Sequence, residues 1–250
     1  MDKHPHIARF LFHGALCDFP GIPNRPEGVT LRFGGRPSVK DLIEAQGVPH
    51  VEVDAICRNG KRIDFSVRVH DGDRVEVFAD AEKAACGDGK KLKPLWEGVK
   101  KFILDGHLGT LARDLRLLGI DTAYDNDASD SIIISRAEKE HRIILTRDIG
   151  LLRDGAVRHA RWIRHTDPDA QLKEILLAYD LESEISPFSR CLKCNGRLQR
   201  VGKDEIRDCL PLKVRRHMQE FDRCTRCGQI YWKGTHYEKL MEKVRSILNR

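Results

Sequence analysis

The chain of 250 residues contains no run of about 18 consecutive apolar residues, which is the length that a membrane-spanning helix needs. Its first residues, Met1-Asp-Lys-His-Pro-His6, lack the apolar core of a secretion signal. The sequence also has no GxxxxGK[ST] phosphate loop, and its Ser and His residues lack the spacing of a hydrolase triad. We therefore expect a cytoplasmic protein without a membrane span, and neither a P-loop nucleotidase nor a triad hydrolase.

The composition favours a folded chain with a strongly polar surface. Apolar residues make up 40% of the sequence, which is enough for a buried core, and charged residues make up 33%. The net charge of +6 is compatible with a nucleic-acid partner, although many basic proteins bind none. The length allows one large domain or a few small ones.

Four of the eight cysteines form two Cys-x-x-Cys pairs, Cys191/Cys194 and Cys224/Cys227. Each such turn presents two thiolates, so two turns together complete a tetrahedral zinc site. A closed site of four sulfurs has no position for a substrate, so we expect structural zinc; the alternatives are a redox dithiol or a disulfide. The remaining cysteines are scattered, and we expect buried or free thiols at Cys17, Cys57, Cys86 and Cys209.

Residues 1–80 are predicted to form a small β-rich unit. Ser38 is a suitable cap for a helix that begins at Val39. Strands are expected at residues 7–12, 28–33, 51–56 and 74–78. Two strands, a helix and further strands describe a β-grasp, or ubiquitin-like, arrangement.

This unit resembles the sulfur-carrier proteins of thiamine and molybdopterin synthesis. The resemblance lies in Val39-Lys-Asp-Leu-Ile-Glu44, Asn59-Gly60 and Asp71-Gly-Asp-Arg-Val-Glu-Val77. Those carriers end in a free Gly-Gly, whereas here the last strand runs into Ala79-Asp-Ala-Glu82 and the chain continues. We therefore expect a docking or stabilising module, and not sulfur transfer.

Residues 81–100 are predicted to be a basic linker, because Gly and Lys are frequent there and no apolar period is present. Its lysines, together with the one that follows, are Lys90, Lys91, Lys93, Lys100 and Lys101. They are interpreted either as a solvated segment or as phosphate contacts beside the site that follows.

Residues 101–186 alternate between strand and helix patterns, which predicts a mainly parallel sheet in a three-layer α/β domain. Strands are expected at residues 102–104, 121–124, 142–146 and 160–163. Helices are expected at residues 108–118, 132–140 and 168–179. The two patterns together make this the α/β part of the chain.

Three acids occupy corresponding places in these repeated units. Asp105 and Asp148 follow predicted strands, and Asp130 opens a predicted helix. In a parallel sheet they would lie along one edge, where three carboxylates repel one another unless a divalent cation lies between them. Oxygen ligands suit Mg²⁺ or Mn²⁺, which activate water for attack on a phosphate. Taken singly, Asp130 is better explained as a helix cap, and Asp105 and Asp148 as turn residues. That explanation does not account for acids at corresponding ends of separate units.

Residues 187–250 change character and are predicted to form a zinc ribbon with a terminal helix. Helices are expected at residues 211–219 and 237–248. In Tyr231-Trp-Lys-Gly-Thr-His236, an aromatic pair stands beside a basic residue, as in sites that stack on nucleic-acid bases. Packing over the zinc turns is the other interpretation of these aromatic residues.

The second half of the chain resembles the Mut-seven C-terminal ribonuclease domain family. The resemblance lies in residues 108–124, in Asp130, in Arg142-Ile-Ile-Leu-Thr-Arg-Asp148, and in the two cysteine pairs with Gly228-Gln-Ile-Tyr-Trp-Lys-Gly-Thr-His236. That family has a PIN-like nuclease fold with a C-terminal zinc ribbon, and some bacterial members carry an N-terminal ubiquitin-like domain. The fold class implied is α/β, with a β-grasp domain, a PIN-like parallel-sheet domain and a zinc ribbon.

The resemblance also implies roles for individual residues. The acids that bind catalytic Mg²⁺ or Mn²⁺ would be Asp105, Asp130 and Asp148. The basic residues near the phosphate would be Arg113, Arg116 and Arg147, although the first two are also explained by a solvated helix face or by pairing with Asp114 or Asp121. Thr110 stands where the family more often has a basic residue. A fourth acid is expected, and its candidates are Asp125 and Asp127.

Two functions from different classes follow. The first is a metal-dependent ribonuclease with RNA as its partner and a structural zinc ribbon. The second is a non-catalytic adaptor, in which the ribbon and the β-grasp unit bind RNA or protein. A protein partner of the β-grasp unit is compatible with either function, and the sequence does not predict an oligomeric state.

Overall fold

The computed structural model describes residues 5–22, 27–87 and 89–248. Its internal contacts divide the chain into two compact units. Unit 1 holds residues 1–98 and 144–164, and unit 2 holds residues 99–143 and 165–250. Within the described ranges, no helix combines the length and the apolar character needed to cross a membrane.

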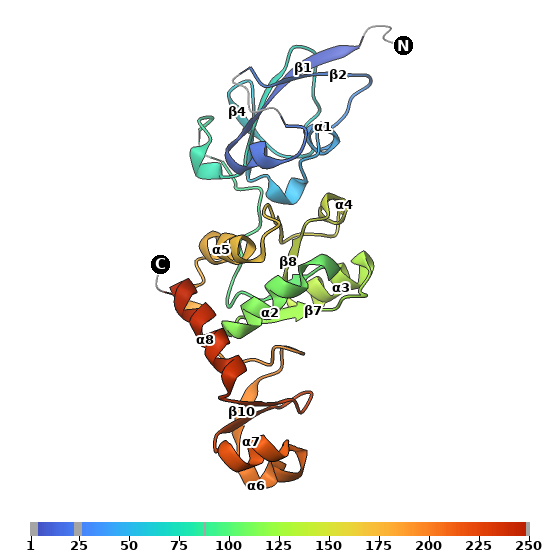
Figure 1. Ribbon diagram of the computed structural model, residues 1–250. Helices are drawn as coiled ribbons and strands as arrows, with labels where there is room; N and C mark the ends of the chain where they lie inside the picture. The colour runs from blue at the N-terminus through green and yellow to red at the C-terminus, as the bar shows by residue number, and fades with distance from the viewer. Residues whose placement is uncertain (1–4, 23–26, 88, 249–250) are drawn as a thin grey trace. The chain divides into compact units, whose positions relative to one another are not determined.

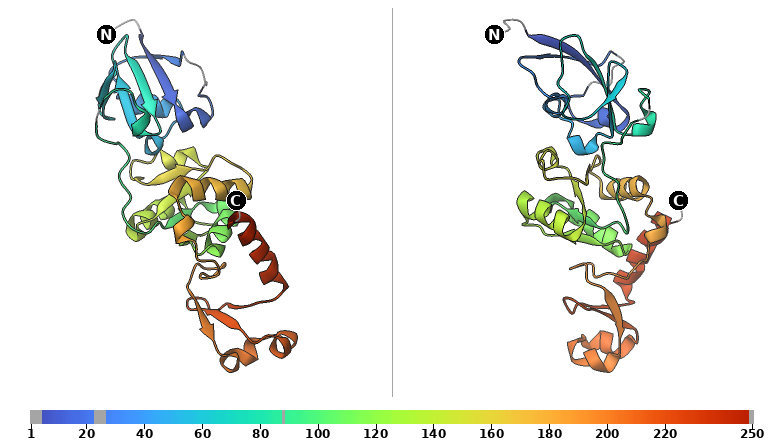
Figure 2. Two further views of the ribbon diagram at one scale, coloured as in Figure 1. Left: turned by 90° about the vertical axis from the view of Figure 1, so that its left-hand side faces the viewer. Right: turned by 180° about the vertical axis from the view of Figure 1, so that it is seen from behind.

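The N-terminal part of unit 1 is a five-stranded mixed sheet (Figures 1 and 2). The strands are β1 (His6–His13), β2 (Val29–Phe33), β3 (Ala55–Arg58), β4 (Lys61–Ile63) and β5 (Arg74–Phe78), in the order β2-β1-β5-β3-β4. Strands β1 and β5 are parallel, and the other pairs are antiparallel. This mixed sheet confirms the ubiquitin-like fold that the sequence predicts.

Helix α1 (Val39–Ala45) packs its apolar face into the core of this sheet, and Val39 and Ile43 are buried. Ser38 caps the helix as expected, because its hydroxyl accepts the N–H of Asp41 while the Asp41 carboxylate accepts the N–H of Ser38. This reciprocal capping explains why the helix begins at Val39. The 3₁₀ helix η1 (Gly14–Asp18) follows β1.

Two expectations for unit 1 are wrong. Residues 51–56 do not form one strand, because Pro49 leads into the 3₁₀ helix η2 (His50–Glu52), and β3 begins only at Ala55. Val51 and Val53 are nevertheless buried, so the apolar alternation reports burial and not strand. Cys57 and Cys86 are joined by a disulfide instead of being free thiols. The short 3₁₀ helix η3 (Ala81–Lys83) lies in the segment between these two cysteines.

The α/β part contains a four-stranded sheet in the order β7-β6-β8-β9. The strands are β6 (Phe102–Leu104), β7 (Thr122–Tyr124), β8 (Ile143–Thr146) and β9 (Ala160–Trp162). Strand β6 is parallel to β7, and β8 is parallel to β9. The helices are η4 (Gly106–Leu108), α2 (Gly109–Leu117), α3 (Asp130–Glu140), α4 (Ile149–Leu152), α5 (Pro168–Tyr179) and η5 (Glu182–Glu184). The parallel pairing and alternating helices confirm the predicted α/β class.

Within unit 2, α2 packs on β7 and α5, and α3 packs on β6 (Figure 1). The apolar face of α2 is buried through Leu111, Ala112 and Leu115, which are the positions that a helical period predicts. Phe102 of β6 meets the ring of Tyr179 of α5 edge to face, with centroids 5.2 Å apart. These contacts fix the end of β6, where Asp105 follows.

The C-terminal ribbon is a three-stranded antiparallel sheet of β10 (Leu198–Val201), β11 (Phe221–Cys224) and β12 (Ile230–Trp232), in that order. Between β10 and β11 the chain forms α6 (Lys203–Ile206), η6 (Arg207–Cys209) and α7 (Leu212–His217). Ile206, Leu210 and Phe221 form the small core beneath these helices. The inserted helix is thus present within the predicted range 211–219.

Helix α8 (Thr235–Leu248) follows the ribbon and begins two residues earlier than the predicted range. It extends from the ribbon toward α2 and α5 (Figure 2). Lys243 of α8 donates to the buried carboxylate of Asp114 at 2.7 Å and lies 3.0 Å from Asp169. One ammonium therefore ties the terminal helix to two helices of the α/β part.

Within unit 1, the β-grasp part contacts the segment 144–164 through specific polar and aromatic groups. The buried carboxylate of Glu52 accepts the N–H of Trp162 at 2.7 Å. The rings of Phe19 and Trp162 stack with centroids 4.5 Å apart. Arg164 pairs with Asp18 at 2.9 Å. These contacts hold the β-grasp part to segment 144–164, and its role as a docking or stabilising module stays a prediction.

Candidate functional site

The four paired cysteines converge on one point, as their spacing predicts. The Sγ atoms of Cys191, Cys194, Cys224 and Cys227 all lie within 4.8 Å of one another. Cys191 Sγ lies 3.6 Å from Cys227 Sγ, and Cys194 Sγ lies 3.4 Å from Cys224 Sγ. A tetrahedral zinc with sulfur about 2.3 Å away has sulfur–sulfur edges of about 3.8 Å. The cysteine group therefore fits zinc in both donor type and size.

The backbone of each turn is shaped to bring its sulfurs together. In the first turn Asn195 has a φ of 67°, and its N–H donates to Cys191 O at 2.9 Å. A Cβ on Gly196 would lie 2.7 Å from Cys224 Sγ, so only glycine allows the two turns to approach. In the second turn the N–H groups of Arg226 and Cys227 donate to Cys224 Sγ.

Those two donors favour a thiolate at Cys224. Burial alone would raise the pKa of the Cys224 thiol, but the backbone N–H groups of Cys227 and Arg226 outweigh it and lower the pKa to about 7. Metal ligation requires a deprotonated sulfur, which these two N–H groups favour at Cys224.

Arg116 is buried, with 4% of its surface exposed, and binds the backbone of the first cysteine turn. Its guanidinium donates to Thr122 O at 2.9 Å and to Leu192 O and Lys193 O at 3.1 Å each. It thereby fixes the Cys191–Cys194 turn against α2 and β7. The structure gives Arg116 this structural role, and its phosphate contact stays a prediction.

Asp121 is the second link between the α/β part and the ribbon. Its carboxylate accepts from Arg142 at 2.6 Å, from Asn195 at 2.8 Å and from Arg190 at 2.9 Å. Burial alone would raise the pKa of Asp121, but the hydrogen bonds from Arg142 and Asn195 hold it below its usual value. Pairing with Asp121, one of the alternative explanations of Arg116, does not hold, since Arg142, Asn195 and Arg190 occupy this carboxylate.

Asp105 follows β6 directly and caps η4, because its Oδ1 accepts the N–H of His107 at 2.9 Å. The residue is buried, with 6% of its surface exposed. Its position is the carboxyl end of a parallel strand, which is where open α/β sheets bind ligands. The capping role and a place in an active site are compatible, since one oxygen satisfies the cap.

Tyr124 brings the acidic loop 125–127 beside Asp105. Its hydroxyl donates to Gly106 O at 2.7 Å and lies 3.1 Å from Asn126 Oδ1. A Cβ on Gly106 would lie 2.8 Å from Asn126 O, so glycine is needed for this close approach. Burial raises the pKa of Tyr124, and the carboxylates of Asp105, Asp127 and Asp125 add to the rise. Both candidates for the fourth acid therefore lie within electrostatic range of the Tyr124 hydroxyl, as Asp105 does.

The other two predicted acids are exposed. Asp130 is the first residue of α3, in unit 2 with Asp105. Asp148 caps α4 in unit 1, where its Oδ1 accepts the N–H of Gly150 at 2.6 Å. Asp148, expected as a turn residue, is therefore a helix cap, whereas Ser129 and not Asp130 occupies the cap position of α3. The grouping of the three acids around one metal stays a prediction.

The two remaining predicted arginines differ in their surroundings. Arg147 donates to Ile163 O and Arg164 O at 2.9 Å each, within unit 1. Arg113 is exposed on α2 and makes no ion pair with a residue of the described ranges. Arg113 is therefore free to approach a ligand from the face of α2 that points toward the ribbon.

A pocket of about 440 Å³ lies between the first cysteine turn and the start of the acidic loop. We call it the turn pocket. Its lining includes Tyr124 and Asp125, and its cations are Arg116, Arg136, Arg142, Lys193 and Arg226. Glu140 pairs with Arg136 and Arg142, whereas Lys193 is exposed and makes no ion pair among the residues described. The pocket is polar and carries an excess of positive charge.

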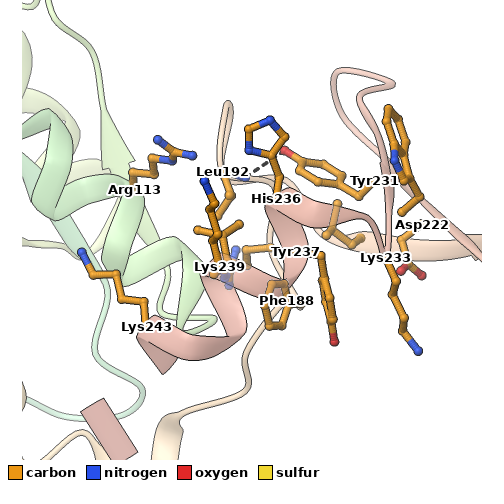
Figure 3. A pocket seen from close by; sticks show the side chains of 14 residues that line it. Arg113, Phe188, Leu192, Asp222, Tyr231, Lys233, His236, Tyr237, Lys239 and Lys243 are labelled. Atoms are coloured by element: carbon orange, nitrogen blue, oxygen red, sulfur yellow. Dashed lines mark hydrogen bonds between the residues drawn. The ribbon is translucent and has the colours of Figure 1, made fainter. Parts of the chain in front are cut away.

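A second pocket, of about 460 Å³, lies between the ribbon, α2 and α8 (Figure 3). We call it the ribbon pocket. The sequence draws attention to Arg113 and to the segment 231–236, which contributes Tyr231, Trp232, Lys233 and His236, but it does not predict the pocket. The other lining residues are Phe188, Arg190, Leu192, Leu198, Asp222, Tyr237, Lys239, Leu240 and Lys243. The whole lining comes from five separate segments of the chain, which explains why sequence spacing did not indicate the pocket.

Comparisons with known families agree with this architecture. Residues 100–244 match the family described as the Mut7-C RNAse domain, and residues 5–84 match the one described as Mut7-C ubiquitin. No curated protein and no solved structure gave a match. The first match covers more than half of the chain and supports a ribonuclease. The chain therefore belongs to the Mut7-C RNAse domain family and carries an N-terminal ubiquitin-like domain of the Mut7-C type.

Proposed function

We propose that the protein is a metal-dependent ribonuclease that hydrolyses phosphodiester bonds of RNA at Asp105, Asp130 and Asp148. The observation that carries the proposal is the setting of Asp105. Asp105 directly follows β6, a parallel strand of the RNAse domain. It lies beside an acidic loop that Tyr124 holds in place. Buried carboxylates with further acids nearby repel one another unless a cation is bound, so this setting favours a metal ion.

The donor set fits Mg²⁺ or Mn²⁺, because every candidate ligand offers carboxylate oxygen. Asp105, Asp130 and Asp148 would hold the ion, and Asp125 or Asp127 would be the fourth acid. When bound, such an ion activates water and offsets the negative charge that develops on the phosphate. The Asp105 carboxylate is held in one orientation by the N–H of His107, so one oxygen keeps a fixed direction.

Basic residues around the acids would hold the RNA backbone. Lys193 in the turn pocket and Arg113 on α2 are exposed cations without an ion pair among the described residues. Arg147, whose guanidinium is oriented by two carbonyl groups, would contribute a further phosphate contact. Such contacts to phosphate position the RNA without reading its sequence.

In this proposal the cysteine group binds structural zinc and the ribbon contributes to RNA binding. A closed Cys₄ site leaves no open position on the metal, so the zinc would not take part in the reaction. The ubiquitin-like domain supports segment 144–164 through Glu52 and Phe19, and a protein partner would use its other surfaces. The cytoplasmic location expected from the sequence is retained as part of this proposal.

The test is hydrolysis of end-labelled single-stranded RNA by the zinc-loaded protein with Mn²⁺, with Mg²⁺, and with no added divalent ion. Cleavage is expected only with an added ion. Asp148→Asn is expected to lower the rate on the order of 100-fold, because the ligand set of the ion is broken. Asp154→Asn is the matched control, since Asp154 is an exposed turn acid in the same unit.

Two outcomes would contradict the proposal. Cleavage that Asp148→Asn leaves unchanged would remove Asp148 from the site. Absence of cleavage across single-stranded, duplex and structured RNA would favour the non-catalytic adaptor.

A further inference from the structure

We propose that the ribbon pocket binds an unpaired base of a single RNA strand, with Arg113 and Lys239 on the neighbouring phosphates. The inference rests on the proposed function only in taking RNA as the ligand. The inference adds to that function a base-binding site some distance from the acids. Such a site would make the protein prefer single-stranded RNA. The pocket volume of about 460 Å³ lies within the range of small-ligand sites.

The first support is an aromatic wall. The rings of Phe188 and Tyr237 lie with centroids 4.5 Å apart and planes inclined by 38° (Figure 3). Both side chains are only partly buried, so ring surface remains open to the pocket. Stacking of bases on such rings is the usual way in which proteins hold single strands without strict sequence preference.

The second support is that the zinc turn fixes Tyr231, another aromatic residue that lines the pocket. The hydroxyl of Tyr231 accepts the N–H of Leu192 at 3.1 Å and lies 3.1 Å from Cys191 Sγ, so the zinc turn fixes this ring. Trp232 contributes to the core of the ribbon. Packing over the zinc turn is therefore confirmed for Tyr231, whereas Trp232 packs against the core of the ribbon. Both residues also line the pocket. The base contact is assigned to Tyr237 and Phe188.

The third support is the backbone of Phe188, which has a φ of 59°. A bulky residue seldom adopts this left-handed conformation, and such residues cluster at binding sites. Here it is imposed by α2, since the N–H of Phe188 donates to Leu117 O at 3.0 Å and that of Ser186 donates to Leu118 O at 2.8 Å. The result is that the Phe188 ring forms part of the pocket wall.

The fourth support is charge. Asp222 is the single acid among the residues that line the pocket, against five Lys and Arg residues. Lys233 pairs with Glu220 and Lys243 with Asp114. Arg113 and Lys239 are exposed and make no ion pair with any described residue (Figure 3). Exposed, unpaired cations beside aromatic rings match a phosphate–base repeat and would repel a basic peptide.

The pocket is also within reach of the proposed cleavage site. Arg113 follows Asp105 by eight positions along η4 and α2, all within unit 2. Helical rise over that length is on the order of 12 Å. A strand anchored by one base in the ribbon pocket can therefore extend to Asp105 across a few nucleotides.

The experiment is fluorescence anisotropy with fluorescein-labelled oligouridine at several KCl concentrations and without added divalent ions. Asp105→Asn protein serves as the background, so binding is measured without cleavage. Tyr237→Ala is expected to weaken binding on the order of tenfold, and Tyr237→Phe to leave it unchanged. Lys239→Ala is expected to weaken binding. It should also reduce the slope of the logarithm of the binding constant against the logarithm of the KCl concentration by about one.

The matched control is Lys213→Ala, which removes an exposed lysine of α7 that does not line the pocket. It should bind like the parent. The inference is overturned if oligouridine does not bind, if duplex RNA competes as well as single strands, or if Lys239→Ala and Tyr237→Ala bind like Lys213→Ala. Zinc content is measured for every variant. If Tyr237→Ala loses zinc, the binding measured for Lys239→Ala decides whether the ribbon pocket holds RNA, because Lys239 is exposed.

These outcomes separate the pocket from the nuclease. Oligouridine binding that depends on Tyr237 and Lys239, in a wild-type protein that hydrolyses no RNA, would uphold the pocket and remove the ribonuclease. Hydrolysis of RNA by the wild type, with oligouridine binding unchanged in Tyr237→Ala and Lys239→Ala, would uphold the ribonuclease and exclude the ribbon pocket as a base-binding site.

Discussion

Lys243, near the end of α8, donates to the carboxylate of Asp114 at 2.7 Å, and that carboxylate is buried between α2 and its neighbours. Burial raises the pKa of Asp114, while the hydrogen bond from Lys243 opposes the rise. The same ammonium lies 3.0 Å from Asp169 at the start of α5. The terminal helix is thus held to the α/β part by one shared cation.

Lys243→Met is therefore expected to destabilise unit 2 by about 3 kcal/mol, since it leaves a buried carboxylate without its cation. The double variant Lys243→Met/Asp114→Asn should recover most of the loss, because no buried charge remains. Urea denaturation followed by circular dichroism measures both. Equal stability of Lys243→Met and the wild type would show that the pair does not hold α8.

Asp121 makes stability depend on pH. Its pKa is held below the usual value near 3.9, so its stabilising contribution is complete above that value and is lost as the pH falls through the lower, folded-state pKa. Asp121→Asn should cost about 3 kcal/mol at neutral pH, because Arg142 and Arg190 lose their shared partner. The difference between variant and wild type should shrink below about pH 4. A difference that stays constant with pH would contradict this role.

The cysteine group predicts about one zinc per chain by elemental analysis. Cys194→Ser should bind well under one zinc and lose the fold of the ribbon, because metal binding and folding are coupled in such sites. Cys209→Ser is the control, since Cys209 is exposed and lies outside the group. Zinc content that Cys194→Ser does not change would refute the assignment.

Glu52 is the expected anchor of the ubiquitin-like domain on β9. Its carboxylate is 3% exposed and accepts the N–H of Trp162. Glu52→Ala should cost about 2 kcal/mol and speed hydrogen exchange at the Trp162 amide, because that N–H loses a charged acceptor. Glu82→Ala, which removes an exposed ion pair with Lys91, should change little. Unchanged exchange at Trp162 in Glu52→Ala would contradict the anchor.

Much of the fold was predictable because it depends on local patterns. The helical period of Leu108, Leu111, Ala112 and Leu115, the cap at Ser38 and the Cys-x-x-Cys spacing all report directly on geometry. The structure of residues 51–56 was not predictable in this way. The buried Val51 and Val53 give the same apolar alternation as a strand, although the chain turns after Pro49.

The site was less predictable, because its geometry depends on contacts distant in sequence. Asp105 is indicated by its place after an apolar run, but its relation to loop 125–127 depends on the hydroxyl of Tyr124 reaching Gly106 O. Arg116 looks like a surface arginine of a helix, yet carbonyl groups 76 and 77 positions away bury it. The disulfide of Cys57 with Cys86 and the left-handed backbone of Phe188 likewise have no local sequence signal.

We propose that Asp105 belongs to a metal-dependent RNA hydrolysis site. The most direct test is the single-turnover rate of cleavage of labelled single-stranded RNA with Mn²⁺, for the wild type and for Asp105→Asn at equal zinc content. We predict cleavage by the wild type and a rate lower by at least about 100-fold in the variant, since a ligand of the ion is lost. Equal rates in the two proteins would exclude Asp105 from the hydrolysis site.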